Sequence, residues 1–300
     1  MVNPRAWLAE AIATFGLVFF GPLSVILSAA WYGDGLSTEA IIFISLGHGG
    51  IIVLMVYAFG HISGAHINPA VTIPMMITKK IDVKNGIGYI LFQIMGAIVA
   101  TLTLQALFPE IGKKVFWGAH GGPSELIGNS MVSGLVVEII LTFFLVVVIY
   151  MVAVHTKAPK QIYGGAIGGM VFLLHLVGVP LTGASMNPAR SFSPAVVSGD
   201  AGLWEVQWLY WVGPIIGGII GGGKARRARR RAAKKLKAMN AKMAQLEANR
   251  QEIINPYEDS TNLSSMMSNP MANLAVATQA TEMQIEETDQ ALANTLDTIR

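Results

Sequence analysis

The sequence predicts an all-α membrane protein with six transmembrane helices and two re-entrant half-helices, arranged as an inverted repeat. Three observations lead to this fold class: long apolar runs, two short apolar pieces that each follow an Asn-Pro pair, and motifs that occur in both halves. The chain is 53% hydrophobic and only 13% charged, whereas about 25% of the residues of a soluble domain are charged. The composition therefore excludes an ordinary soluble domain.

Six runs approach the length of about 20 apolar residues with which a helix crosses a bilayer. The expected spans are residues 6–31, 38–59, 86–107, 131–154, 162–180 and 203–223. The first run is long enough to span, so we interpret it as a membrane helix and not as a cleavable signal. The sixth is the weakest, because Glu205 interrupts it and three glycines end it before Lys224.

Two further apolar pieces, 69–78 and 188–197, are too short to cross a membrane. Asparagine is a preferred residue before the first turn of a helix, and proline suits that turn itself. We therefore expect two half-helices that begin at matching tripeptides. The tripeptides are Asn68-Pro69-Ala70 and Asn187-Pro188-Ala189.

Sequence motifs repeat between the halves of the membrane region. "EAIATF" matches "EIILTF", and "ISGAHINPA" matches "LTGASMNPA". Three spans and one half-helix occur twice, so the second copy enters the membrane from the opposite side. Inverted repeats of this kind place their site near the middle of the bilayer, where broken helices meet. Non-helical backbone at that depth lines a water-filled cavity or is packed in protein.

Charge divides the chain into two expected domains, a membrane domain 1–223 and a tail 224–300. The first contains equal numbers of basic and acidic residues. The tail starts with a basic run, Lys224 to Lys242, and is mostly acidic afterwards. We expect the tail to be partly helical or disordered, with a turn at Asn255-Pro256 and a second helix over 271–300. The basic run suits anionic lipid at a membrane surface; a nucleic-acid contact and a remnant of gene fusion are the alternatives.

The membrane domain resembles the aquaporins of the major intrinsic protein family. The resemblance covers about 1–223 and rests on "GHISGAHINPAV", on "TGASMNPARSFSPA" and on the glutamate repeated in the first and fourth spans. It implies a passive channel, assembled as a homotetramer of four separate pores. The tail lies outside this family; "ANRQEIINPYEDSTNL" and "VATQATEMQIEETDQALANTLDTIR" are similar to structural proteins of marine phages.

The two Asn-Pro-Ala tripeptides are called the first and the second box below. Their physical role follows from helix dipoles. Half-helices that meet tip to tip direct two positive ends into one lumen. Asn68 and Asn187 cap these helices and still carry amide N–H donors for the pore. A water held there by its oxygen directs both hydrogens outward, which interrupts proton hopping, and cations meet a positive potential.

The resemblance also implies a selectivity filter. An arginine inside a membrane domain is functional by default, and the family places Arg190 in the outer constriction together with His48, His175 and Ala184. The alternative for either histidine is a packed side chain bonded to a helix carbonyl. Glycerol facilitators have aspartate where this chain has Ser191. Water is therefore the expected substrate, with ammonia or hydrogen peroxide as additional small neutral solutes.

Three further residues are expected to anchor the loops. In the family, the acids at Glu10 and Glu138 accept hydrogen bonds from the re-entrant loops, and their symmetric placement argues against acid–base catalysis. His66 is interpreted as a loop anchor as well.

The chain lacks cysteine and shows no nucleophile–base pair or metal-ligand spacing, so we expect no enzyme, cofactor or metal site. The alternative function is a membrane-anchored structural or interaction protein whose tail is the working part.

Loop charges predict the orientation, because basic residues favour the cytoplasmic side. One side carries Arg5, the basic run and two short basic loops, and Lys113 and Lys114 are a minority on the other. The loops contain Lys79, Lys80, Lys84, Lys157 and Lys160. We therefore expect a multi-pass protein of the cytoplasmic membrane with both termini in the cytoplasm.

Overall fold

The computed structural model describes residues 2–33, 35–155, 158–159, 161–258, 279, 282–288 and 290, and within α10 it leaves the side chains of 224–233 and 250–258 undescribed. The chain divides into two compact units, Met1–Ala225 and Arg226–Arg300. Lys157 and Lys160 lie outside the described residues, as does most of the helix expected over 271–300.

Five helices of the described chain are long and apolar enough to cross a membrane. They are α1 (Pro4–Tyr32), α2 (Thr38–Ser63), α4 (Val83–Leu107), α6 (Met131–Ile149), which the π-helical turn η3 (Tyr150–Val154) extends, and α7 (Tyr163–Thr182). These helices confirm the first five expected spans. A sixth apolar helix begins at Leu209, as the first part of α10 (Leu209–Glu258).

Polar caps explain where four of these helices begin. In each case a side-chain oxygen just before the helix accepts a backbone N–H of the first turn, which would otherwise lack a partner. The caps are Asn3 for α1, Ser37 for α2, Asp82 for α4 and Ser130 for α6. At the other end, Gly64 and Gly183 terminate α2 and α7 with left-handed backbone, φ 87° and 83°.

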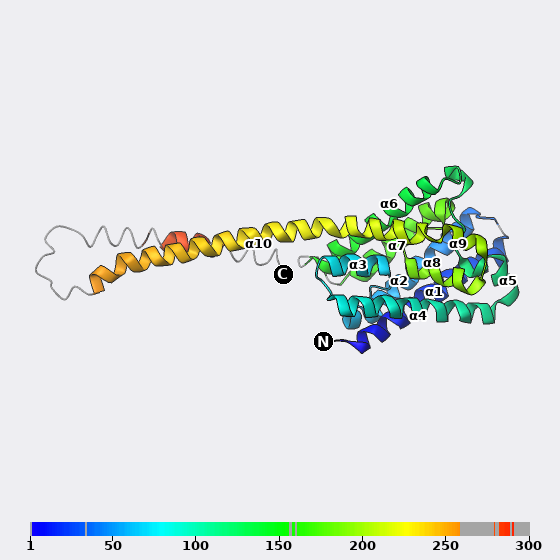
Figure 1. The fold of residues 1–300 in the computed structure, drawn as a ribbon, viewed down its shortest axis with the longest axis horizontal. Coiled ribbons are helices and arrows are strands. Elements are labelled where there is room, and N and C mark those ends of the chain that lie inside the picture. Colours follow the sequence, from blue (N-terminus) through cyan, green and yellow to red (C-terminus); the bar gives the residue numbers. More distant parts are fainter. Residues whose placement is uncertain are drawn as a thin grey trace, which may run out of the picture. The chain divides into compact units, whose positions relative to one another are not determined.

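The two half-helices are present as α3 (Pro69–Ile77) and α8 (Pro188–Ser198). Each starts at the proline of its Asn-Pro pair, with the asparagine as the cap. Figure 1 shows both short helices among the long ones of the first unit. The prediction of half-helices at these two positions is therefore confirmed.

The expected span 203–223 is wrong in its first part. A separate short helix, α9 (Ala201–Gln207), precedes a turn at Trp208, and α10 begins only at Leu209. Asp200 caps α9 by accepting the N–H of Leu203 at 3.2 Å, and the buried Gln207 donates to the carbonyl of Ser191 in α8 at 3.3 Å. The bond from Gln207 therefore connects α9 to the half-helix α8.

The turn expected at Asn255-Pro256 is also wrong, because α10 continues through both residues to Glu258. Proline lacks the N–H that would continue the helical hydrogen-bond pattern. Pro256 therefore removes one hydrogen bond of α10 without ending the helix at Asn255.

A compact loop with three short helices connects α4 to α6. They are α5 (Pro109–Lys114), η1 (Phe116–Gly118) and η2 (Glu125–Ile127). Phe116, Trp117 and Gly118 all have left-handed backbone, with φ of 47°, 48° and 80°. The Trp117 side chain is buried and donates from Nε1 to the carbonyl of Phe108 at 3.2 Å. This contact fixes the loop against the end of α4.

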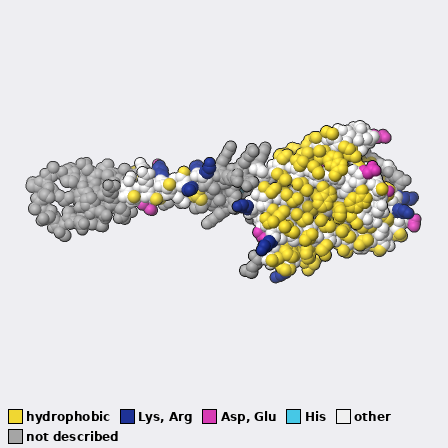
Figure 2. Space-filling view, viewed as in Figure 1, with side chains coloured by type: hydrophobic (Ala, Val, Ile, Leu, Met, Phe, Trp, Pro, Cys, Tyr) yellow, Lys and Arg dark blue, Asp and Glu magenta, His cyan; other side chains and the backbone are white. Residues whose placement is uncertain are grey.

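The lateral surface of the first unit is apolar. Figure 2 shows a face covered by hydrophobic side chains, with charged side chains gathered toward its two ends. Large apolar residues such as Leu54, Leu91 and Val132 are 61%, 57% and 73% exposed. A soluble protein rarely exposes so extensive an apolar surface. The surface fits the hydrocarbon core of a bilayer, which supports the membrane assignment.

Small residues allow close helix contacts inside the unit. A Cβ atom placed on Gly96 of α4 would lie 2.1 Å from the carbonyl oxygen of Ala11 in α1. Membrane helices approach closely where glycine removes the side chain. We therefore expect Gly96→Ala to lower the free energy of unfolding by about 1–3 kcal/mol, the typical cost of overpacking.

Thermal unfolding of the detergent-solubilised protein measures this effect. Gly50→Ala in α2 is the matched control, because a Cβ there would meet nothing within 4 Å. Equal unfolding temperatures for the two variants would contradict the tight packing of α1 on α4.

Candidate functional site

The segments before α3 and α8 share an unusual backbone. Each contains two non-glycine residues with left-handed φ, one and three positions before the asparagine. They are Ala65 (φ 47°) and Ile67 (φ 59°) in the first segment, and Ala184 (φ 56°) and Met186 (φ 52°) in the second. Such conformations cost about 1–3 kcal/mol each and persist where surrounding contacts hold them. The two loops therefore repeat in geometry as well as in sequence.

The two asparagines connect the loops reciprocally. Asn68 Nδ2 donates to the carbonyl of Met186 at 2.7 Å, and Asn187 Nδ2 donates to the carbonyl of Ile67 at 3.1 Å. Their Oδ1 atoms accept backbone N–H groups of the half-helices they cap. Each amide nitrogen carries two hydrogens, so each retains one N–H beyond this cross-connection. The structure thus brings the two predicted boxes into direct contact.

Glu10 of α1 is fully buried and binds the first loop. Its Oε1 accepts from Ser63 Oγ at 2.6 Å and from the N–H of His66 at 2.9 Å. Its Oε2 accepts from the N–H of Ile67 and from Gln93 Nε2, both at 2.7 Å. Four donors therefore converge on one carboxylate, which compensates for its burial.

Glu138 of α6 has the corresponding position in the second half and is also fully buried. Its Oε1 accepts from Thr182 Oγ1 at 2.8 Å and from the N–H of Ser185 at 2.9 Å. Its Oε2 accepts from the N–H of Met186 at 2.9 Å. Both carboxylates thus hold the residue whose carbonyl binds the asparagine of the other loop.

His66 lies at the edge of the first loop and is half-buried. Besides its backbone bond to Glu10, its Nδ1 lies 3.2 Å from Thr72 Oγ1, and its ring contacts Tyr89 edge-on at 5.1 Å between centroids. The side chain therefore links the loop to α3 and α4.

Arg190 is buried in α8, with 3% of its surface exposed. Its NH1 donates to the carbonyl of Gly118 in the α4–α6 loop, and its NH2 lies 3.2 Å from His48 Nε2. His48 Nδ1 lies 2.9 Å from the carbonyl of Ile44. Because that carbonyl only accepts, Nδ1 carries the proton and Nε2 accepts from the guanidinium. His48 is therefore bonded to a helix carbonyl and to Arg190 at once.

His175 of α7 resembles His48 at one ring nitrogen and differs from it at the other. Its Nδ1 donates to the carbonyl of Val171 at 2.8 Å, while its Nε2 is buried and has no protein partner among the described residues. The His175 ring stacks on His48, with centroids 4.3 Å apart. Ala184, the fourth predicted filter residue, is fully buried. The structure thus brings His48, His175 and Arg190 together.

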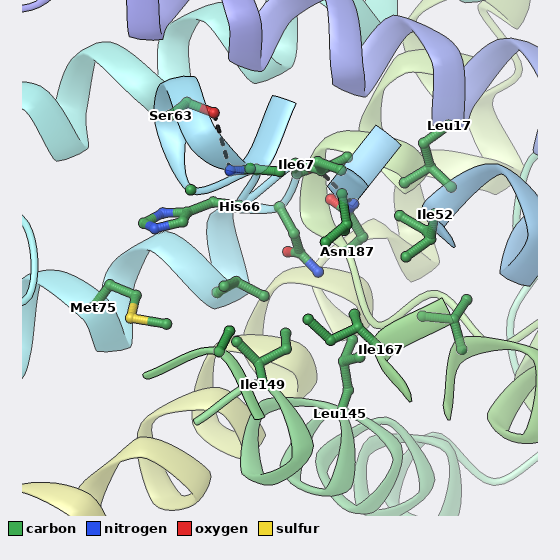
Figure 3. A pocket seen from close by; sticks show the side chains of 18 of the residues that line it. Leu17, Ile52, Ser63, His66, Ile67, Met75, Leu145, Ile149, Ile167 and Asn187 are labelled. Atoms are coloured by element: carbon green, nitrogen blue, oxygen red, sulfur yellow. Dashed lines mark hydrogen bonds between the residues drawn. The ribbon is translucent and has the colours of Figure 1, made fainter. Parts of the chain in front are cut away.

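A cavity of about 550 Å³ connects these features. Its wall includes both asparagines and the trio His48, His175 and Arg190, and it reaches Ile81 beyond α3 and Val154 at the end of η3. Figure 3 shows Asn187 beside Ile67, with the apolar side chains of Leu145, Ile149 and Ile167 facing them. The cavity wall therefore combines polar groups, from the loops, Arg190 and the two histidines, with apolar side chains that come mainly from the helices. Within the described part of the chain, no group of three His, Asp or Glu residues could hold a metal ion.

Some contacting residues are not evident from the sequence. Gly118, which binds Arg190, and His120, which contacts the second loop, both belong to the α4–α6 loop and carry no motif. Gln93 could have been found, because a polar residue within an apolar span needs a buried partner.

Comparisons with known proteins show the family to which the chain belongs. The sequence model of the family described as major intrinsic protein matches residues 1–223. Aquaporin Z of Rhodopseudomonas palustris (strain ATCC BAA-98 / CGA009) is 36% identical over 226 residues, covering 74% of this chain and 92% of the relative. Aquaporin-4 of Homo sapiens is 40% identical over 222 residues, 72% of this chain and 66% of the relative.

A solved structure supports the same fold. The X-ray structure of the aquaglyceroporin from Plasmodium falciparum matches with a TM-score of 0.65 and covers 75% of this chain and 96% of its own. The identity is 24%, so this likeness concerns the fold and not the solute. Together with the cavity and the paired loops, these matches show that the chain belongs to the major intrinsic protein family and is a multi-pass membrane channel for water or small solutes, not an enzyme.

Proposed function

We propose that this channel conducts water and excludes protons and ions. The observation that carries the proposal is the reciprocal contact of Asn68 and Asn187, which holds the N-termini of α3 and α8 at one point of the cavity wall. Helix N-termini carry partial positive charge, and each asparagine retains one N–H. A water molecule at this point accepts hydrogen bonds through its oxygen, so it cannot relay a proton.

The second element of the proposal is the filter, formed by His48, His175, Ala184 and Arg190. The buried Arg190 Nε–H and His175 Nε2 have no protein partner among the described residues. One group donates and the other accepts, which suits a small polar molecule that does both. The fixed guanidinium charge repels cations at the same place. In this proposal Glu10, Glu138 and His66 hold the loops and take no part in proton transfer.

Stopped-flow light scattering on proteoliposomes tests the proposal. We expect vesicles with the full chain to shrink faster in a hyperosmotic pulse than empty vesicles, and a pH-sensitive dye inside them to show no added proton leak. Shrinkage at the rate of empty vesicles, with folded protein present, would refute the water channel. It would favour the alternative, a membrane-anchored protein whose charged tail is the working part.

Ammonia and hydrogen peroxide are proposed as further solutes, because histidine at position 48 adds a polar wall to the filter. His48→Phe should leave water flux in place while ammonia flux falls about fivefold, the factor that corresponds to one net hydrogen bond of about 1 kcal/mol. Alkalinisation of a dye inside the vesicles measures ammonia entry. Equal ammonia flux in both proteins would show that His48 acts through packing alone.

We also propose a homotetramer in the cytoplasmic membrane, with both termini cytoplasmic. Native mass spectrometry measures the assembly. The orientation can be measured with single cysteines, because the natural chain has none. A cysteine at Lys79 should be protected from an impermeant maleimide in intact cells, and one at Lys113 should be labelled. The reverse pattern would contradict the proposed orientation.

The basic run Lys224–Lys242 is proposed to bind anionic lipid, since each basic residue near such a surface contributes about 1 kcal/mol. Phosphatidylglycerol should then raise the unfolding temperature of the full chain more than phosphatidylcholine does. An equal effect of both lipids would remove this part of the proposal.

A further inference from the structure

His120 is a buried histidine outside the membrane helices, in the loop that connects α4 to α6. Only 3% of its surface is exposed, and both ring nitrogens contact the second half-helix region. Nε2 lies 3.2 Å from the carbonyl of Gly183, and Nδ1 lies 2.9 Å from Ser191 Oγ. Both partners flank the second box, at the end of α7 and in the first turn of α8.

These contacts define the tautomer of His120. The Gly183 carbonyl can only accept, so Nε2 carries the proton, and Nδ1 therefore accepts from the Ser191 hydroxyl. Burial, together with the positive charge of Arg190, holds the pKa of His120 well below its ordinary range, so the ring is neutral. The Ser191 oxygen is then free to accept from Ser185 Oγ, which itself accepts the N–H of Asn187 at 3.2 Å. The tautomer of His120 thus sets the direction of two bonds, from Ser191 to His120 and from Ser185 to Ser191.

The ring also fits closely between its neighbours. It packs on the aromatic ring of Tyr210, with centroids 4.8 Å apart. Tyr210 in turn accepts the N–H of Gly122 at 3.0 Å and donates to the carbonyl of Thr182 at 2.8 Å. A Cβ atom at Gly183 would lie 2.4 Å from His120 Cδ2. The loop is therefore held against the second box on both sides of the histidine.

Two residues before His120, Gly118 provides the carbonyl that binds Arg190 NH1. The backbone at Gly118 has φ 80°, a conformation that glycine adopts at low cost. From this geometry we infer that His120 is a positioning residue: it holds the loop so that the Gly118 carbonyl fixes Arg190 in the filter, and it thereby sets the channel's selectivity for water over larger polar solutes such as urea. This inference rests on the proposed water channel.

The experiment compares His120→Ala, His120→Gln and the wild type in proteoliposomes. A glutamine amide can donate to Gly183 and accept from Ser191, whereas alanine can do neither. We expect the ratio of urea to water permeability to rise about tenfold in His120→Ala, as for the loss of one well-formed buried hydrogen bond, and to return close to the wild-type value in His120→Gln. Glu125→Gln, an exposed residue of the same loop, is the control and should keep the wild-type ratio.

An unchanged ratio in His120→Ala, or equal ratios in the alanine and glutamine variants, would overturn the inference while leaving the water channel intact. Wild-type vesicles that fail to conduct water would instead refute the proposed function.

Two measurements keep the inference testable if His120→Ala does not fold. Ser191→Ala removes one partner of the ring and should raise the ratio in the same direction. Nitrogen-15 NMR of histidine-labelled protein should show His120 protonated at Nε2, and protonation at Nδ1 would contradict the inference.

Discussion

Arg190→Ala is expected to leave water conduction in place and to raise urea permeability by roughly one order of magnitude, the factor expected when hydrogen bonds to a charged group are lost. Arg190 is buried, and its donation to Gly118 and to His48 holds the side chain in place. Removing it opens the filter and takes away the positive charge that opposes protons and cations. Proton leak should therefore rise together with urea flux.

Stopped-flow scattering in urea gradients and a pH-sensitive dye inside the same vesicles measure both effects. Arg5→Ala is the matched control, since Arg5 is an exposed arginine near the N-terminus. If the variant retains the proton and urea permeability of the wild type, Arg190 does not line the conduction path.

Arg190→Lys separates charge from geometry. Lysine retains the charge but lacks the planar fork that reaches Gly118 and His48 together. We expect the lysine variant to exclude protons nearly as well as the wild type and to admit more urea. Comparable proton leak in the lysine and alanine variants would mean that the fixed hydrogen bonds matter more than the charge.

The sequence predicts much of this fold because its signals are local. An apolar run of about 20 residues or an Asn-Pro pair before a short apolar piece needs no knowledge of tertiary structure. The first five spans and the half-helices α3 and α8 follow from such signals. The break at Trp208 does not, because it depends on Gln207 reaching the Ser191 carbonyl in another helix.

The site divides in the same way. Asn68 and Asn187 are recognisable as a pair in the sequence. The sequence does not indicate that each asparagine donates to the backbone carbonyl of the residue that precedes the other asparagine. That exchange arises only when the loops of the two sequence repeats meet. Likewise, the sequence leaves two interpretations open for His48 and for His175: a residue of the pore filter, or a packed side chain. The structure shows that one ring nitrogen of each binds a helix carbonyl and that the other is directed elsewhere.

Replacing the buried carboxylates of Glu10 and Glu138 with amides tests how the loops before α3 and α8 are held. In Glu138→Gln an NH₂ group replaces Oε2, which accepts the N–H of Met186 in the wild type. Two donors then face each other in a buried site. We expect a loss of about 1–3 kcal/mol in the free energy of unfolding, the cost of leaving a buried donor without an acceptor. Water permeability should also fall, since the Met186 carbonyl positions Asn68.

Glu10→Gln should lower the free energy of unfolding less than Glu138→Gln does. Its new NH₂ group also faces a backbone N–H, that of Ile67, but it has a second neighbour that can adapt. Gln93 Oε1 is buried without a partner among the described residues, so a turn of the Gln93 amide would let this oxygen accept from the new NH₂ group. No comparable amide lies among the hydrogen-bond partners described for Glu138.

Thermal unfolding in detergent should therefore rank the proteins as wild type, Glu10→Gln and Glu138→Gln, from most to least stable. Glu205→Gln, an exposed residue of α9, should unfold like the wild type. The reverse order of the two buried variants would show that Gln93 does not adapt and that the first loop depends more strongly on its carboxylate than the second.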